Sequence, residues 1–223
     1  MSAVGFLHTA ESHVETFGAL VGDLDPARVH VHVVRPDLLE RARLHGPDDE
    51  ILGEELRGVL RDLVERDARV VVCTCSTLGG LSEQCGSDAG IDVLRVDRPM
   101  AELAVRGGSR IGVVAALEST LPPTRALLYD AAVGAGKQIT LIDAPCFDAW
   151  GRFEQGDIEG YHRDVAGCVD ALDPTIDVVV LAQASMAGAA SLVKTDRVVL
   201  SSPRTAVQAA LALAAASARD AGR

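Results

Sequence analysis

The feature that most constrains the fold of this chain is an approximate internal repeat. The segment Val4–Ser12 aligns with Ile111–Ser119, and the segment Val70–Gly80 aligns with Val178–Gly188. Both pairs are separated by about half of the 223 residues. In each pair an apolar run is followed by matching small and polar residues, which disfavours a chance similarity between two Val-rich runs. Two repeats at one spacing predict a chain built from two similar units.

Short apolar runs alternate with longer segments of helical periodicity along the chain. The expected strands are Ala3–His8, Arg28–Val34, Ala68–Thr74, Ile91–Val96, Arg110–Ala115, Gln138–Asp143, Ile176–Leu181 and Arg197–Leu200. The expected helices are Glu11–Asp23, Asp48–Arg66, Thr124–Gly136, Tyr161–Leu172 and Ser202–Arg219, with a further helix opening after Cys75. The strands are apolar throughout, which is typical of parallel sheets covered by helices. We therefore predict an α/β fold with two pseudo-symmetric, Rossmann-like lobes.

The repeat also predicts the domain organisation. We expect a first lobe over residues 1–100 and a second over residues 101–199, with residues 200–223 packing back on the first. Open α/β sheets bind ligands at the carboxyl ends of their strands. The active site is therefore expected in the cleft between the lobes.

Composition narrows the possible partners and the compartment. With 32 acidic and 21 basic side chains, the formal net charge is −11, which disfavours nucleic acid and anionic membranes as partners. There is no signal-peptide pattern at the N-terminus and no apolar run of the ~18 residues that a spanning helix needs, so we expect a cytoplasmic protein. The five cysteines, an odd number, argue against a disulfide framework.

The candidate site centres on Cys75, which follows the apolar run Val70–Cys73 and opens a predicted helix. A thiol at a helix N-terminus has its thiolate stabilised by the helix dipole, which suits a nucleophile or a general base. Ser76 and Thr77 add hydroxyl groups beside it. Gln183 holds the equivalent position in the second repeat. Its amide can orient a substrate carboxylate, or alternatively form a hydrogen bond at the start of a helix.

The Cys75–Thr77 segment resembles the Cys-Asn-Thr motif of the aspartate/glutamate racemase superfamily, which includes hydantoin racemase, maleate isomerase and arylmalonate decarboxylase. The Ala182–Ala187 segment resembles the second motif of that family, a Gly-Cys element after a buried strand. The opening strand with its polar turn, Val4–Thr9, and the turn at Ser119–Thr120 also fall at family positions. The resemblance covers nearly the whole chain and implies a two-lobed, cofactor-independent enzyme.

The chain departs from the family pattern at three positions. Family racemases use one cysteine on each face of the substrate, and here Gln183 stands in place of the second. His8 replaces the acidic residue after the first strand, and Ser185 replaces the histidine of the second motif. These departures favour a mechanism with one thiol, Cys75. His8 would polarise the substrate or act as the base on its opposite face, unless it only caps the next helix or bonds a backbone carbonyl.

The predicted function is proton transfer at, or thiol addition to, the carbon next to the carboxylate or carbonyl of a small substrate. The reaction would be an isomerisation, racemisation or decarboxylation, with Cys75 and His8 as catalytic residues. The candidates for substrate binding are Thr9, Ser76, Thr77, Ser119, Thr120, Gln183, Ala184 and Ser185. Two alternatives remain open: a Cys75-dependent hydrolase or acyl transferase, and a non-catalytic protein that binds small carboxylates.

No cofactor or metal is expected. The sequence contains no GxGxxG motif and no P-loop. The pair Cys73 and Cys75 lacks a second ligand pair at the spacing of a zinc site, and we interpret Cys73 as a core residue. The remaining histidines, His13, His30, His32, His45 and His162, suggest no cluster along the sequence. The Ala-rich segment near the C-terminus suits a packed helix, with a homodimer or larger homo-oligomer as a possible assembly.

Overall fold

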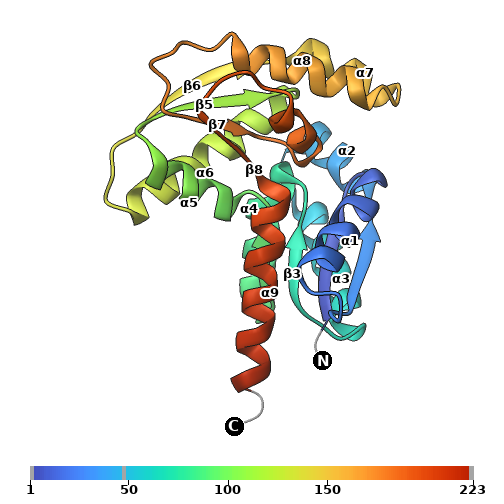
Figure 1. Ribbon diagram of the computed structural model, residues 1–223. Helices are drawn as coiled ribbons and strands as arrows, with labels where there is room; N and C mark the ends of the chain where they lie inside the picture. Colours follow the sequence, from blue (N-terminus) through green and yellow to red (C-terminus); the bar gives the residue numbers. More distant parts are fainter. Residues whose placement is uncertain (1–2, 47–48, 221–223) are drawn as a thin grey trace. The chain divides into compact units, whose positions relative to one another are not determined.

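The computed structural model describes residues 3–46 and 49–220, with side chains up to residue 217 (Figure 1). The chain divides into two compact units, Met1–Val96 with Pro203–Arg223, and Asp97–Ser202. Each unit contains one four-stranded parallel sheet with helices connecting its strands. The predicted α/β class with two similar parallel-sheet lobes is thereby confirmed.

The first unit has the strand order β2-β1-β3-β4. Its strands are β1 (Ala3–His8), β2 (His30–Val34), β3 (Ala68–Cys73) and β4 (Asp92–Arg95). Its helices are α1 (Ser12–Leu24), α2 (Pro36–His45), α3 (Glu50–Glu65) and α4 (Ser76–Ala89), joined from Pro203 onward by the C-terminal α9 (Ser202–Asp220). Figure 1 shows α9 in red and β3 in turquoise.

The second unit has the strand order β6-β5-β7-β8. Its strands are β5 (Arg110–Ala115), β6 (Thr140–Pro145), β7 (Val178–Leu181) and β8 (Val198–Ser201). Its α-helices are α5 (Arg98–Gly107), α6 (Leu121–Gly134), α7 (Trp150–Glu154) and α8 (Ile158–Asp170), and its 3-10 turns are η1 (Glu118–Thr120), η2 (Phe147–Ala149) and η3 (Ala184–Ser191). The order repeats that of the first sheet, because β5 and β7 correspond to β1 and β3 at the centre.

Buried apolar side chains at helical spacing place α3 against the first sheet. Leu52, Leu56, Leu60 and Leu63 are fully buried and belong to one core cluster with residues of β1 and β3. The Asp49 side chain caps the helix by accepting a hydrogen bond from the Leu52 amide at 3.0 Å. The predicted helix over residues 48–66 is therefore present as Glu50–Glu65, while position 48 lies outside the described residues.

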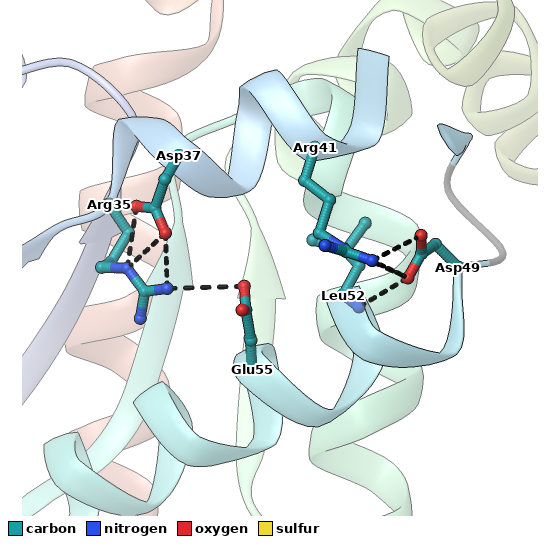
Figure 2. A network of polar contacts seen from close by, with 6 residues as sticks. All are labelled: Arg35, Asp37, Arg41, Asp49, Leu52 and Glu55. Carbon is teal, nitrogen blue, oxygen red and sulfur yellow. Dashed lines mark hydrogen bonds and ion pairs between the residues drawn. The ribbon is translucent and has the colours of Figure 1, made fainter. Parts of the chain in front are cut away.

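A polar network joins α2 to α3 (Figure 2). Arg41 on α2 donates to both carboxylate oxygens of Asp49, at 3.0 Å and 3.1 Å. Arg35, just before α2, pairs with Asp37 at 2.6 Å and reaches Glu55 of α3 at 3.5 Å. These contacts fix the orientation of α2, which the sequence pattern does not predict.

The sequence-based expectation for the cysteines is wrong for one pair. Cys146, which follows β6, forms a disulfide with Cys168 of α8, and their Cα atoms are 6.3 Å apart. This Cα separation lies within the usual range for a disulfide. Cys73, Cys75 and Cys85 take part in no disulfide within the described residues and are buried. Sequence spacing could not reveal the pairing, since it depends on how α8 packs near the end of β6.

Candidate functional site

Cys75 lies at the carboxyl end of β3 and occupies the N-cap position of α4. Its backbone is extended (φ −105°, ψ 112°), and within the described chain its side chain makes no capping hydrogen bond. The residue is 8% exposed and contacts the core cluster beneath α2, α3 and α4. Cys73 is fully buried in the same cluster, which confirms its interpretation as a core residue. Cys75 therefore has the helix-start position that a reactive thiol needs.

The other site candidates of the first unit lie near the carboxyl ends of β1 and β3. Ser76 and Thr77 are the first two residues of α4, and the N-terminus of a helix carries a partial positive charge. Thr9 directly follows β1 and is partly buried. Because β1 and β3 are parallel neighbours, the loops that follow them lie at the same end of the sheet. This end of the sheet supplies hydroxyl and amide donors suited to an anion.

His8, the last residue of β1, is fully buried and uses both of its ring nitrogens. Nδ1 lies 2.9 Å from Thr74 Oγ1, and Nε2 lies 2.8 Å from Nδ1 of His32. In this arrangement His8 has no nitrogen left to contact a substrate directly. Any contribution of His8 to catalysis must pass through Thr74 or His32.

The interpretation that the other histidines do not cluster is wrong for three of them. His30 Nδ1 lies 2.8 Å from His32 Nε2, and His13 Nδ1 lies 3.5 Å from Thr74 Oγ1. The register of β1 and β2 pairs His30 with Val4 and His32 with Phe6, so the alternate residues of both strands share a face. The alternation of His30 and His32 was visible in the sequence, but their partner strand was not.

Burial keeps three of these imidazoles neutral. It lowers the pKa of His8 to about 3, with smaller contributions from His32 and His13. It also lowers the pKa of His13 to about 4, and that of His32 to about 4 with a further contribution from His30. Phe6 and Phe17 pack against the rings, with Phe6 stacked on His32 at a centroid distance of 5.0 Å. At neutral pH each of the three rings therefore has one donor and one acceptor nitrogen.

In the second unit Gln183 connects the loops that follow β7 and β5. Its Oε1 accepts hydrogen bonds from the amides of Ala116 at 2.7 Å and Leu117 at 3.2 Å. The residue holds the N-cap position of η3, but the bonds go to the neighbouring loop instead of the start of its own helix. Within the described residues, its amide nitrogen takes part in no hydrogen bond, so it can still donate to a ligand.

Ser185 is held by two residues that the sequence analysis did not connect with the site. Tyr161 OH lies 3.0 Å from Ser185 Oγ, and His162 Nε2 lies 2.9 Å from the Ser185 carbonyl oxygen. Burial raises the pKa of Tyr161 to about 12, so the phenol stays protonated. A Cβ at position 188 would collide with the His162 ring, which explains glycine there.

The remaining candidates of the second unit lie near the ends of β5 and β7. Ser119 and Thr120 form η1, with Ser119 partly exposed and Thr120 buried, and Ala184 is buried at the start of η3. Thr124, one turn further along, is buried, and its Oγ1 has no partner among the residues described. No pattern in the sequence singles out Thr124. The candidates of the two units therefore fall at equivalent strand ends of two separate sheets.

A surface pocket of about 540 Å³ lies at the amino ends of β5, β6 and β7, away from the strand ends that carry the candidate residues. Its polar side chains already support the backbone: Lys137 donates to the carbonyls of Val105 and Arg106, and Asp177 accepts from the amides of Ser109 and Arg110. These contacts stabilise the ends of helices and strands. The pocket is therefore not the candidate site.

Neither a metal centre nor a membrane span is found in the part of the chain that the structure describes. No group of three or more His, Cys, Asp or Glu side chains there is placed to hold a metal ion. No described helix is long and apolar enough to cross a membrane.

Comparison with family models and with curated proteins gives no match, whereas solved structures do match. Aspartate racemase from Picrophilus torridus has a TM-score of 0.74 at 12% identity, covering 96% of this chain and 95% of its own. Glutamate racemase from Francisella tularensis, in complex with D-glutamate, has a TM-score of 0.70 at 13% identity, covering 95% and 80%. Allantoin racemase from Klebsiella pneumoniae has a TM-score of 0.66 at 18% identity, covering 97% and 89%.

At identities this low, the likeness shows the fold. The described chain has the two-sheet α/β fold of glutamate and aspartate racemases over nearly its whole length. This confirms the fold that the Cys75–Thr77 and Ala182–Ala187 segments implied.

Proposed function

We propose that this protein is a cofactor-independent enzyme of the racemase and isomerase kind that acts on a small carboxylate. In this proposal, Cys75 transfers a proton at the carbon next to the carboxylate. The single observation that supports it is the position of Cys75 at the start of α4 in a fold shared with racemases. The thiol there makes no capping hydrogen bond within the described chain. Proton transfer by a positioned side chain is the chemistry that such a thiol can supply.

The substrate carboxylate would be held by hydroxyl and amide groups at the strand ends. Ser76, Thr77 and Thr9 contribute from the first unit, where the amides that open α4 attract negative charge. The candidates from the second unit are Ser119, Thr120, Gln183, Ala184 and Ser185. Donors of this kind also stabilise the enolate that forms when the proton leaves.

His8 has an indirect role in this proposal. Its neutral ring holds Thr74, the residue directly before Cys75, through the 2.9 Å contact to Thr74 Oγ1. It thus contributes by positioning Thr74 and by sharing a proton with it.

The first prediction concerns Cys75. Aspartate, glutamate, allantoin, maleate and a malonate are incubated with the protein in D2O, and deuterium at carbon is measured by mass spectrometry. We expect the wild type to label at least one of them, and Cys75→Ala to lower the labelling rate by about 10²–10⁴-fold. Circular dichroism checks that the variant is folded.

The matched control is Cys85→Ala, which removes a second free, buried thiol from the same unit. This variant should keep the labelling rate, because Cys85 contacts the Gly53 carbonyl on α3 and lies in the core. Equal labelling by wild type and Cys75→Ala would contradict the proposal. Tight binding of a probe without any labelling would instead indicate a carboxylate-binding protein.

A further inference from the structure

Five polar side chains of the first unit form a continuous row from the edge of the sheet to the start of α1. Consecutive members contact one another in the order His30, His32, His8, Thr74 and His13, at 2.8, 2.8, 2.9 and 3.5 Å. The first two belong to the edge strand β2, where His30 is partly exposed. The last belongs to the first turn of α1.

The donors of His30, His32 and His8 must all point in one direction. A neutral imidazole has one N–H donor and one acceptor nitrogen, and both middle rings, His32 and His8, use both nitrogens within the row. If one ring changes tautomer, its neighbours must change as well. The Thr74 hydroxyl suits such a reversal because it can also donate to the Leu7 carbonyl, 3.1 Å away.

His13 is the end of the row with an unpartnered ring nitrogen among the described residues. Its Nδ1 is directed at Thr74 Oγ1, while its Nε2 is buried and has no partner among the described residues. A buried ring nitrogen without a partner is uncommon in a folded protein and requires an explanation. His13 lies at the start of α1 and Cys75 at the start of α4, both following carboxyl ends of neighbouring strands in one sheet.

We propose that this row is a proton relay, and that His13 Nε2 is the base that exchanges a proton with the substrate. The proposal rests on the proposed function, in which Cys75 is the partner acid. His8, His32 and His30 then carry the proton between Thr74 and solvent at the edge strand. The lowered pKa values of His8, His13 and His32 support this role, since neutral rings can both accept and donate.

The relay conserves protons at every step. A proton from the substrate carbon binds Nε2 of His13, and the proton on its Nδ1 passes to Thr74 Oγ1. The hydroxyl proton of Thr74 passes to Nδ1 of His8, and the proton on Nε2 of His8 passes to Nδ1 of His32. The proton on Nε2 of His32 passes to Nδ1 of His30, whose Nε2 releases one to solvent.

At the end all five groups are neutral and the tautomers are reversed. The electron pair of the broken C–H bond stays on the substrate as an enolate until the proposed thiol donates a proton to that carbon. The row returns to its first state when a proton enters at Nε2 of His30 and passes in the opposite direction, so that Nε2 of His13 releases its proton to the thiolate of Cys75. Solvent water is therefore the only co-reactant.

A purely structural role would not need this connectivity. Phe6 and Phe17 fill the same layer with apolar rings and pack on His8 at 5.9 Å and 5.6 Å between centroids. The substitution His32→Phe would keep the stacking on Phe6 and would remove both hydrogen bonds that the His32 ring makes. Substitution at this position therefore separates packing from proton transfer.

The first test measures proton movement without a substrate. In protein labelled with ¹⁵N-histidine, NMR follows exchange of the His8 and His13 ring N–H protons with D2O. We expect His32→Phe to slow this exchange by about tenfold or more, since exchange must then await local opening. If His32→Phe does not fold, His30→Phe, at the partly exposed end of the row, should slow the exchange in the same way.

His45→Phe is the matched control, because His45 is exposed at the end of α2 and lies outside the row. It should leave the exchange of His8 and His13 unchanged. Unchanged exchange in a folded His32→Phe protein overturns the relay.

The second test uses the deuterium labelling of aspartate and glutamate. We expect His13→Gln to lower Cys75-dependent labelling by about 10²-fold, and imidazole in solution to restore part of it in His13→Ala. Labelling that depends on Cys75 but is unchanged in His13→Gln overturns the relay and leaves the proposed function standing. Absence of Cys75-dependent labelling on every probe overturns the proposed function, and the NMR experiment still decides the relay.

Discussion

At the scale of single residues, the first unit is distinguished by histidines at buried and partly buried positions. The β1–β2 register brings His8 and His32 onto one face, where they pack against Phe6 and Phe17. Such rings are compatible with a core only when they are neutral and hydrogen bonded. Their protonation therefore links the stability of this unit to pH.

We predict that the protein loses stability as the pH falls from about 6.5 towards 4. The pKa values of His8, His13 and His32 are lowered in the folded state, so the unfolded chain binds protons first and acid favours unfolding. Each histidine contributes a slope of up to about 1.4 kcal/mol per pH unit within this range. Urea unfolding at a series of pH values measures the slope.

The contribution of the row is isolated by comparing two variants. His32→Phe should have a shallower slope than the wild type, while His45→Phe, at an exposed position, should keep the wild-type slope. Parallel slopes for all three proteins would show that His32 does not contribute to acid stability.

At the scale of elements, amphipathic periodicity predicts α3 well and α2 not at all. The apolar residues of α3 recur at helical spacing and form one buried face, whereas α2 buries only Leu38 and Ala42. The helix α2 depends on its packing against α3 and on the pair of Arg41 with Asp49 (Figure 2). Those contacts form between segments whose association a periodicity argument does not consider.

Truncation of a buried leucine in α3 should destabilise the protein strongly. Leu56→Ala removes a fully buried side chain from the core cluster of the first unit, and we expect a loss of about 2–5 kcal/mol in the free energy of unfolding. Leu44→Ala is the matched control on α2, since Leu44 is 72% exposed, and should change it by less than about 0.5 kcal/mol. Urea denaturation compares the two, and similar losses would contradict the assignment of the buried face.

At the scale of the whole molecule, two sheets of the same strand order carry equivalent loops with different chemistry. Cys75 and Gln183 both hold an N-cap position after the third strand of their unit. The Cys75 side chain makes no capping hydrogen bond within the described chain, whereas Gln183 Oε1 accepts a hydrogen bond from the Ala116 amide in the loop after β5. The two halves have thus diverged in side chains while keeping one backbone plan.

The disulfide gives a prediction for the covalent structure of the full chain. Under denaturing, non-reducing conditions Cys73, Cys75 and Cys85 should titrate as thiols, and reduction should make all five cysteines reactive. The bond closes a loop of 22 residues in sequence separation, so its loss should lower stability by about 3–4 kcal/mol. Cys168→Ser should match the reduced wild type. Five reactive thiols before reduction would show that the pair is not joined.

The sequence by itself determined the α/β class, the repeat of the sheets and the position of Cys75 after a buried strand. These follow from local patterns, because continuous apolar runs and helix starts depend on neighbouring residues. The tertiary structure alone decided which distant side chains meet. It joined His13, His30 and His32 to His8, and it paired Cys146 with Cys168. Such contacts depend on strand register and helix packing, which no single segment of the sequence specifies.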